Sequence, residues 1–350
     1  MAIAPARTTE LRTEENVVSV GLTAAIVAIV GDVPCALQVE HPAAERRAGG
    51  ATDFARSGLP FGPFDPVAHR TLESGLRQWV EEQTSLQLGY VEQLYTFGDR
   101  GRHDLDPDGA LRVLSVGYLA LTRQNTKRAA GTEWRSWYEH FPWEDWRHGR
   151  PELIDERIAP ALERWLKSSD ASLAERRRER IRQCFGLYDG PGWDEERVLE
   201  RYEILYEAGL VYESKRDRGT REPGARGKPP SEIENDARLG APMIYDHRRI
   251  LATAMGRLRA KLKYRPVIFE LMPAMFTLYD LQRTVEAISG VLVHKQNFRR
   301  LVETGGLVEE TGTTTQTRGR PAQLFRFRRE VLGERPAPGV RLTSPKHTRK

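Results

Sequence analysis

Apolar positions in the first third of the chain follow strand and helix patterns in turn. The longest apolar run, Val17 to Val30, is too short to span a bilayer and lacks the basic start of a signal peptide, so it predicts a buried strand. Gly31-Asp32 indicates a turn into a second strand at Cys35 to Val39. After a polar stretch at 43–57 we expect a helix from Asp65 or Thr71 to about Glu82. Strands are expected near Val91 to Thr96 and Val113 to Leu121.

The middle of the chain is patterned mainly as helix, with apolar positions recurring through 158–166, 173–184 and 193–206. Just before these segments lie Trp134, Trp137, Trp143 and Trp146, a cluster that is more often a core than a ligand cage. The basic run 176–182 is interleaved with glutamates, which favours a solvated helix face. Residues 214–236 are dense in charge, Gly and Pro, and predict a flexible linker.

The C-terminal part has the pattern of a winged helix-turn-helix. Thr277 and Asp280 form a capping box, the apolar positions of the next three turns share one face, and Gly290 ends the helix. A second helix, about His294 to Glu303, would bury Phe298, Leu301 and Val302. Two strands, 307–311 and 323–328, then enclose a basic loop. The exposed side chains proposed to bind DNA are Lys295, Gln296, Asn297, Arg299 and Arg300 of the helix, with Arg318 and Arg320 of the loop.

Charge supports this interpretation. The 350 residues carry a formal net charge of +5. Residues 291–329 contain eight Lys or Arg against three Glu, a surplus equal to that of the whole chain. Concentrated positive charge supplies affinity for phosphates, and Gln296, Asn297 and Arg299 are able to read base edges. Only two cysteines occur, Cys35 and Cys184, which argues against a disulfide framework or a zinc site and fits a reducing cytoplasm.

A helix carrying paired carboxylates lies in the first third. Glu81 and Glu82 follow position 78 by three and four residues, a spacing that places side chains on one helix face, where carboxylates can converge on Mg²⁺. The segment 62–86 resembles a degenerate Nudix signature. In that register Pro63 stands at the first glycine, Thr84 at the second, and Gly62 one residue out of place. His69 and Gln78 replace two glutamates. An amide at Gln78 removes a charge from the metal site, so we expect catalysis to be weak or lost.

Further segments resemble one branch of that superfamily, the Nudix-related transcriptional regulators of NAD metabolism. The matching segments are 94–102, 113–121, 242–250, 269–273, 276–282, 297–300 and 318–322. The resemblance implies an α+β protein: a Nudix-like α/β/α sandwich with a helical insertion and a C-terminal winged helix-turn-helix domain. It also implies a homodimer that binds an operator and a Nudix domain that binds ADP-ribose. The pocket residues it implies, by motif position, are Phe61, Gly62, Arg77, Glu81, Glu82, Phe97 and Asp99.

The domain boundaries expected from these patterns follow the chain in order. They are a flexible N-terminus (1–14), a Nudix-like domain (15–122), an insertion (123–240, linker 214–236), a closing Nudix helix (241–265), a winged helix (266–330) and a disordered basic tail (331–350). The function expected is a cytoplasmic repressor of NAD metabolism genes that has no cofactor and responds to ADP-ribose or a related nucleotide. One alternative is an active Mg²⁺-dependent Nudix pyrophosphatase in which Glu81 and Glu82 hold the metal. Another is a winged helix that docks protein.

Overall fold

A mixed sheet lies at the centre of the computed structural model, which describes residues 18–40, 57–99, 112–123, 129–219, 239–316, 319–334 and 339–340. Within these ranges the strand order is β3-β2-β1-β6-β5, with β4 also pairing with β1 and β7 with β2. β1 and β6 run parallel, and the other pairs are antiparallel. The strands are β1 Val18–Val30, β2 Val33–Glu40, β3 Ser57–Gly58, β4 Phe61–Pro63, β5 Tyr90–Phe97, β6 Arg112–Leu121 and β7 Thr132–Ser136.

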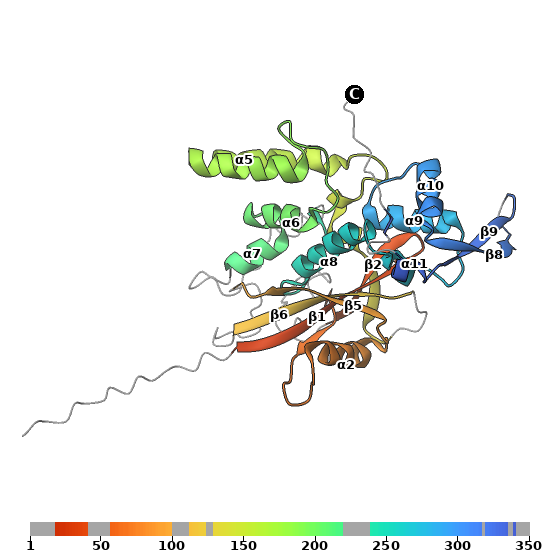
Figure 1. The fold of residues 1–350 in the computed structure, drawn as a ribbon. Helices are drawn as coiled ribbons and strands as arrows, with labels where there is room; N and C mark the ends of the chain where they lie inside the picture. The colour runs from red at the N-terminus through yellow and green to blue at the C-terminus, as the bar shows by residue number, and fades with distance from the viewer. Residues whose placement is uncertain are drawn as a thin grey trace, which may run out of the picture.

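The long apolar strand β1 is buried on both faces because helices cover both sides of the sheet (Figure 1). Leu22, Ala24 and Ile26 face helix α2 (Leu72–Thr84), whose Leu76 and Val80 close one core. The alternate residues Ala25 and Val27 belong to a second, larger core that includes helix α8 (His247–Leu262). The expected hairpin, helix and later strands of this domain are therefore confirmed.

The insertion packs over α8 on the side away from the sheet (Figure 1). Trp137 and Trp143 are fully buried, which confirms that the tryptophan cluster is core. The sequence pattern did not reveal β7, which pairs Thr132 to Ser136 with β2 and so makes the insertion part of the sheet. Its helices are α3 Trp137–His140, η2 Pro142–Glu144, η3 Ile154–Ile158, α4 Ala159–Lys167, α5 Ala171–Phe185, α6 Val198–Glu207 and α7 Tyr212–Gly219.

The prediction of a linker from residue 214 was wrong for its first six residues, which form most of α7. Charged side chains there are buried and paired instead of solvated. Glu213 accepts a hydrogen bond from the Met243 backbone N–H at 3.0 Å, and Asp217 accepts one from the hydroxyl of Tyr206 at 2.8 Å. The high charge density suggested a linker because the residues that pair with these charges lie elsewhere in the chain. Residues 220–236 lie outside the described residues.

The C-terminal domain has the predicted winged helix-turn-helix order, confirmed element by element. Its parts are η6 Val267–Glu270, α9 Leu278–Ser289, α10 Lys295–Gly305, β8 Val308–Thr315, β9 Ala322–Phe327 and α11 Val331–Glu334. Thr277 and Asp280 form the expected capping box, and Gly290 ends α9 in the left-handed conformation. Phe269 stacks on Phe327 with ring centroids 4.2 Å apart, which fixes η6 against the wing strands β8 and β9.

The predicted disordered tail was wrong at two points, where an apolar residue finds a place in the core. Val331 in α11 is fully buried. Val340 is 1% exposed, and its N–H donates to the carbonyl of Leu262 at the end of α8. Residues 335–338 and 341–350 of the tail and the N-terminal stretch 1–14 lie outside the described residues. Within the described ranges, no helix is long and apolar enough to cross a membrane.

Candidate functional site

Helix α10 presents the basic face that its amphipathic pattern predicts. Phe298 and Val302 are buried in the domain core, whereas Leu301 is only partly buried. The side chains predicted to bind DNA from this helix all lie exposed on the opposite face: Lys295, Gln296, Asn297, Arg299 and Arg300. An exposed polar and basic helix carried on a buried apolar stripe is suited to enter a major groove.

The cations of α10 differ from those of the wing in their pairing. In the described part of the chain, Lys295, Arg299 and Arg300 form no ion pair. On the wing and its exit, Arg326 pairs with Glu309 and Arg328 with Glu334, each at 2.6 Å. The basic surplus of this domain is thus least neutralised on α10, which leaves these cations available for an anionic partner.

A groove of about 880 Å³ lies beside the start of α10. Thr277, Tyr279 and Asp280 from the start of α9 form one wall, and Thr315, Gln316 and Ala322 from the wing form another. Lys295 contributes the positive charge. Arg320, at the wing tip, is exposed. Arg318 lies outside the described residues, so its predicted role is not tested.

The carboxylates of the Nudix-like box lie exposed on α2. Glu82 accepts a hydrogen bond from the amide of Gln78 at 2.8 Å, and Glu81 accepts one from Gln87 at 3.3 Å. Within the described residues, no group of three or more His, Cys, Asp or Glu side chains is arranged to hold a metal ion. The amide of Gln78 donates to Glu82 and brings no negative charge, so these side chains fit a Mg²⁺ site of the Nudix kind poorly.

Two residues predicted to bind ligand make contacts within the protein. Arg77 donates to the carbonyls of Leu88 and Gly89, at 2.5 and 3.2 Å, and so ties α2 to the loop that follows it. Gly62 lies against Trp79: a Cβ at Gly62 would come within 2.2 Å of the indole ring. Hydrogen bonds explain the arginine at position 77, and close packing explains the glycine at position 62.

The start of α8 brings the remaining predicted residues together. The ring of Phe61 packs edge-on against Tyr245 and His247, with centroids 5.5 and 5.1 Å apart. Arg249 lies over the ring of Phe97 at 5.3 Å and pairs with Asp99. The structure thus joins Phe61 on β4 to Phe97 and Asp99 at the end of β5, through a helix that begins almost 150 residues later.

The sequence pattern did not reveal the contribution of Tyr245 and Arg249. The backbone of Tyr245 has φ +48°, a left-handed conformation that is uncommon for a residue with a large side chain. Such strain is often found at functional sites. Their place beside Phe61 and Phe97 depends on contacts across the fold, and the only signal in the sequence was the polar run 245–249 at a helix start.

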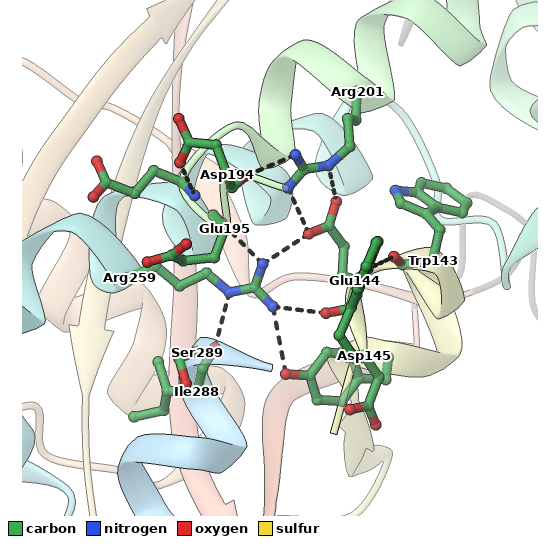
Figure 2. A network of polar contacts seen from close by, with 12 residues as sticks. Trp143, Glu144, Asp145, Asp194, Glu195, Arg201, Arg259, Ile288 and Ser289 are labelled. Atoms are coloured by element: carbon green, nitrogen blue, oxygen red, sulfur yellow. Dashed lines mark hydrogen bonds and ion pairs between the residues drawn. The ribbon is translucent and has the colours of Figure 1, made fainter. Parts of the chain in front are cut away.

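Helix α8 also carries buried arginines that the insertion surrounds. Figure 2 shows Arg259 between Glu144, Glu195 and Ile288. The carboxylate of Glu144 accepts from Arg259 at 2.7 Å and from Arg201 of α6 at 2.6 and 2.8 Å. All three side chains are fully buried. Earlier on the helix, Arg248 donates to the carbonyls of His140 and Leu239, at 2.5 and 2.6 Å, and pairs with Glu213.

A buried histidine stands next to this network. Burial, together with the charges of Arg248 and Arg135, lowers the pKa of His140 to about 3 against the opposing effect of its hydrogen bond to Ala241, so the imidazole is neutral at ordinary pH. Its Nδ1–H donates to the carbonyl of Ala241 at 2.7 Å, which leaves Nε2 to accept from the amide of Gln38 at 2.5 Å. His140 thus joins β2 to the segment that leads into α8 as a neutral hydrogen-bonding group.

Comparison with known proteins identifies the C-terminal domain most clearly. Residues 268–327 match the family model described as the NrtR DNA-binding winged helix domain. A curated relative, the ADPR responsive transcriptional repressor NtrR of Acinetobacter baylyi, is 41% identical over 89 residues, which are 25% of this chain. The matched region spans only 36% of that relative's length.

Comparison with solved structures finds Shewanella oneidensis NrtR complexed with a 27mer DNA. It is 19% identical, has a TM-score of 0.49, and the match covers 90% of this chain and 95% of that one. A MutT/nudix family protein from Enterococcus faecalis is 13% identical with a TM-score of 0.48, and covers 93% and 90%. The α+β fold class and the resemblance to a Nudix-related regulator, both inferred from the sequence, are confirmed.

Proposed function

We propose that this chain is a DNA-binding repressor of NAD metabolism genes whose Nudix-like domain binds ADP-ribose or a related nucleotide. The observation that carries the proposal is the exposed basic face of α10, whose cations form no ion pair with any described residue, in a domain that matches the NrtR winged helix model. The curated relative is named an ADPR responsive repressor, which supports the choice of effector and the sign of the regulation.

In this proposal α10 enters the major groove of an operator as part of a homodimer in the cytoplasm. Arg299 and Arg300 contact phosphates or guanines, and Gln296 and Asn297 contact base edges. The wing, with Arg318 and Arg320, adds phosphate contacts. Binding should therefore depend steeply on salt, because each neutralised phosphate releases counterions.

The nucleotide is proposed to bind where β4, the end of β5 and the start of α8 meet. Phe61 and Tyr245 offer aromatic surfaces for a base. Arg249 is paired with Asp99, Asp246 and Glu203, so it would have to leave one of these carboxylates to meet a diphosphate. We propose that Glu81 and Glu82 do not support hydrolysis. The engagement of Glu82 by Gln78 and the poor fit to a metal site support this part.

One experiment separates repressor from hydrolase. Fluorescence anisotropy of the full chain is measured at near-physiological salt, with and without ADP-ribose and Mg²⁺. The probes are duplexes from upstream of its own gene and of NAD synthesis genes. The same tubes are then assayed for AMP. We expect sequence-selective binding that ADP-ribose weakens, and no AMP.

Glu82→Gln supplies the control for the chemistry. Steady AMP release by the wild-type chain that disappears in Glu82→Gln would overturn the repressor-only proposal and establish an active pyrophosphatase. Duplex binding that shows neither sequence preference nor salt dependence would instead favour a winged helix that docks protein.

A further inference from the structure

The C-terminal end of α9 is held by groups from outside its own domain. The hydroxyl of Tyr138 donates to the carbonyl of Ala287 at 2.7 Å, and Arg259 Nε donates to that of Ile288 at 2.9 Å. The backbone N–H of Trp146 donates to the carbonyl of Gly290 at 2.7 Å. Carbonyls at a helix end lack partners within the helix, and a cation there also complements the helix dipole.

These donors form one unit, because the insertion and α8 are bonded to each other at the same place (Figure 2). Arg259 Nη1 reaches the Glu144 carboxylate at 2.7 Å, and its Nη2 reaches the Glu144 carbonyl at 3.2 Å. Gly290 packs so closely that a Cβ there would come within 2.4 Å of the same carbonyl. We call Tyr138, Glu144, Trp146 and Arg259 the α9 clamp.

The orientation of α10 follows from that of α9. Glu286 of α9 is buried and accepts a hydrogen bond from the Val293 N–H at 3.1 Å, while Gln282 donates to the Val293 carbonyl at 3.1 Å. Val293 lies two residues before α10 begins. The turn between the helices is thereby fixed to α9, so a rotation of α9 carries α10 with it.

At its other end, α8 touches the candidate nucleotide site through Tyr245, His247 and Arg249. The helix has 16 residues, so its two ends lie about 24 Å apart at 1.5 Å per residue. One rigid element therefore connects that site with the α9 clamp.

We propose that the insertion acts as a positioning element for DNA recognition: the α9 clamp fixes α10 relative to α8, and a nucleotide at the start of α8 acts on DNA binding through it. The part that concerns the nucleotide rests on the function proposed above. The clamp itself concerns only α8, α9 and α10 and does not depend on the proposed function. Tyr138, Glu144, Trp146 and Arg259 are positioning residues in this proposal, since none of them lies on the exposed face of α10.

Tyr138→Phe tests the clamp with little loss of packing, because it removes only the hydroxyl that reaches Ala287. The matched control is Tyr206→Phe, which removes a hydrogen bond of similar length to Asp217, also within the insertion but away from α9. Hydrogen exchange of the full chain is followed by mass spectrometry for peptides covering residues 278–305. We expect exchange there to accelerate about fivefold in Tyr138→Phe, the equivalent of about 1 kcal/mol, and to stay unchanged in Tyr206→Phe.

The second readout is the factor by which ADP-ribose changes the Kd for the operator duplex. We expect this factor to shrink at least about threefold in Tyr138→Phe and to keep its wild-type value in Tyr206→Phe. A merely structural role would lower the stability of both variants alike without changing that factor.

The outcomes separate the clamp from the proposed function. Unchanged exchange at 278–305 in Tyr138→Phe, or equal acceleration in both variants, overturns the clamp. Faster exchange with an unaltered ADP-ribose factor overturns the coupling and keeps the clamp. If ADP-ribose leaves DNA binding by the wild-type chain unchanged, the proposed function fails while the exchange result still decides the clamp.

Asp32→Asn tests separately whether the β1–β2 hairpin also holds α9, through a contact outside the α9 clamp. Asp32, at the tip of the β1–β2 hairpin, lies 3.6 Å from Arg283 of α9, and its carbonyl accepts from Arg147 at 3.3 Å. Asparagine tolerates its left-handed backbone, φ +63°. We expect faster exchange in α9 than in the control Asp155→Asn, which breaks the exposed pair with Arg150. Equal exchange in these two variants would overturn a role of the hairpin in holding α9, whereas the α9 clamp is decided by Tyr138→Phe.

Discussion

Arg248 and Arg259 lie eleven residues apart on α8, three helical turns, and both are buried on the side that the insertion covers. Each guanidinium meets a glutamate of the insertion, Glu213 for Arg248 and Glu144 for Arg259. Charges buried in this way are costly unless they are paired and hydrogen-bonded, so the insertion and α8 depend on each other.

Glu144→Gln should unfold the protein far more readily than an ordinary ion-pair mutation. It leaves Arg201 and Arg259 buried without a compensating negative charge, and breaking such a pair costs about 3–5 kcal/mol. Urea denaturation followed by tryptophan fluorescence measures the free energy of unfolding. The control is Glu207→Gln, which breaks a partly exposed pair with Arg180 and should cost under about 1 kcal/mol. Equal losses in the two variants would refute a structural role for the buried network.

Gly290→Ala should destabilise the chain by more than about 2 kcal/mol, combining left-handed strain with a steric clash. Gly290 has φ +74°, and an added Cβ would come within 2.4 Å of the backbone oxygen of Glu144. Gly306→Ala has the same kind of strain, with φ +57°, but its Cβ would meet only the flexible side chain of Arg328, at 3.3 Å. We expect Gly306→Ala to cost about 1 kcal/mol in the same denaturation assay. A smaller effect at Gly290 than at Gly306 would contradict the close packing described here.

His140 should make the protein less stable in mild acid. In the unfolded chain a histidine takes up a proton near pH 6.5, whereas burial holds the pKa of folded His140 at about 3. The unfolded state therefore binds more protons between these values, and stability falls as the pH drops from about 6.5 toward 3, by up to about 1.4 kcal/mol per pH unit. Urea midpoints at pH 7.5 and 5.5 measure the fall, which should be smaller in His140→Gln. His148→Gln, at an exposed position, should behave as wild type.

Arg299→Ala should weaken operator binding and reduce the slope of log Kd against log salt by about 1, because one phosphate or base contact is lost. Arg326→Ala is the matched control: its guanidinium is already paired with Glu309 on the wing, and we expect a smaller change. Anisotropy titrations at three salt concentrations distinguish the two. A larger salt effect at Arg326 would place the main DNA contact on the wing instead of α10.

Local signals account for what the sequence predicted well. The capping box at Thr277 and Asp280 and the stop at Gly290 involve neighbours in the chain, so residue type alone reveals them. The exposed face of α10 follows from its apolar period in the same way. The residues that determine these elements lie within a few positions of one another in the chain, so the sequence alone predicts them.

Pairings between residues far apart in the chain account for what the sequence did not predict. Glu144 meets Arg201 and Arg259 across 57 and 115 positions, and β7 pairs with a strand almost 100 residues earlier. Neither the composition of the chain nor the periodicity of its apolar residues indicates such partners. For the same reason the buried charges of α7 suggested a linker, and Tyr245 and Arg249 were missed as neighbours of Phe61 and Phe97.

The pairing of β7 with β2 bears on how such a chain can change during evolution. A deletion between β6 and α8 would remove, in one step, the partner of Cys35 to Val39 in the sheet and the glutamates that neutralise Arg248 and Arg259. The shortened product would expose an unpaired edge of β2 and the apolar face of α8 that the insertion covers, either of which selection against misfolding would eliminate. Loss of this segment would require new cover for both surfaces, so the middle third, once acquired, is retained by its own contacts.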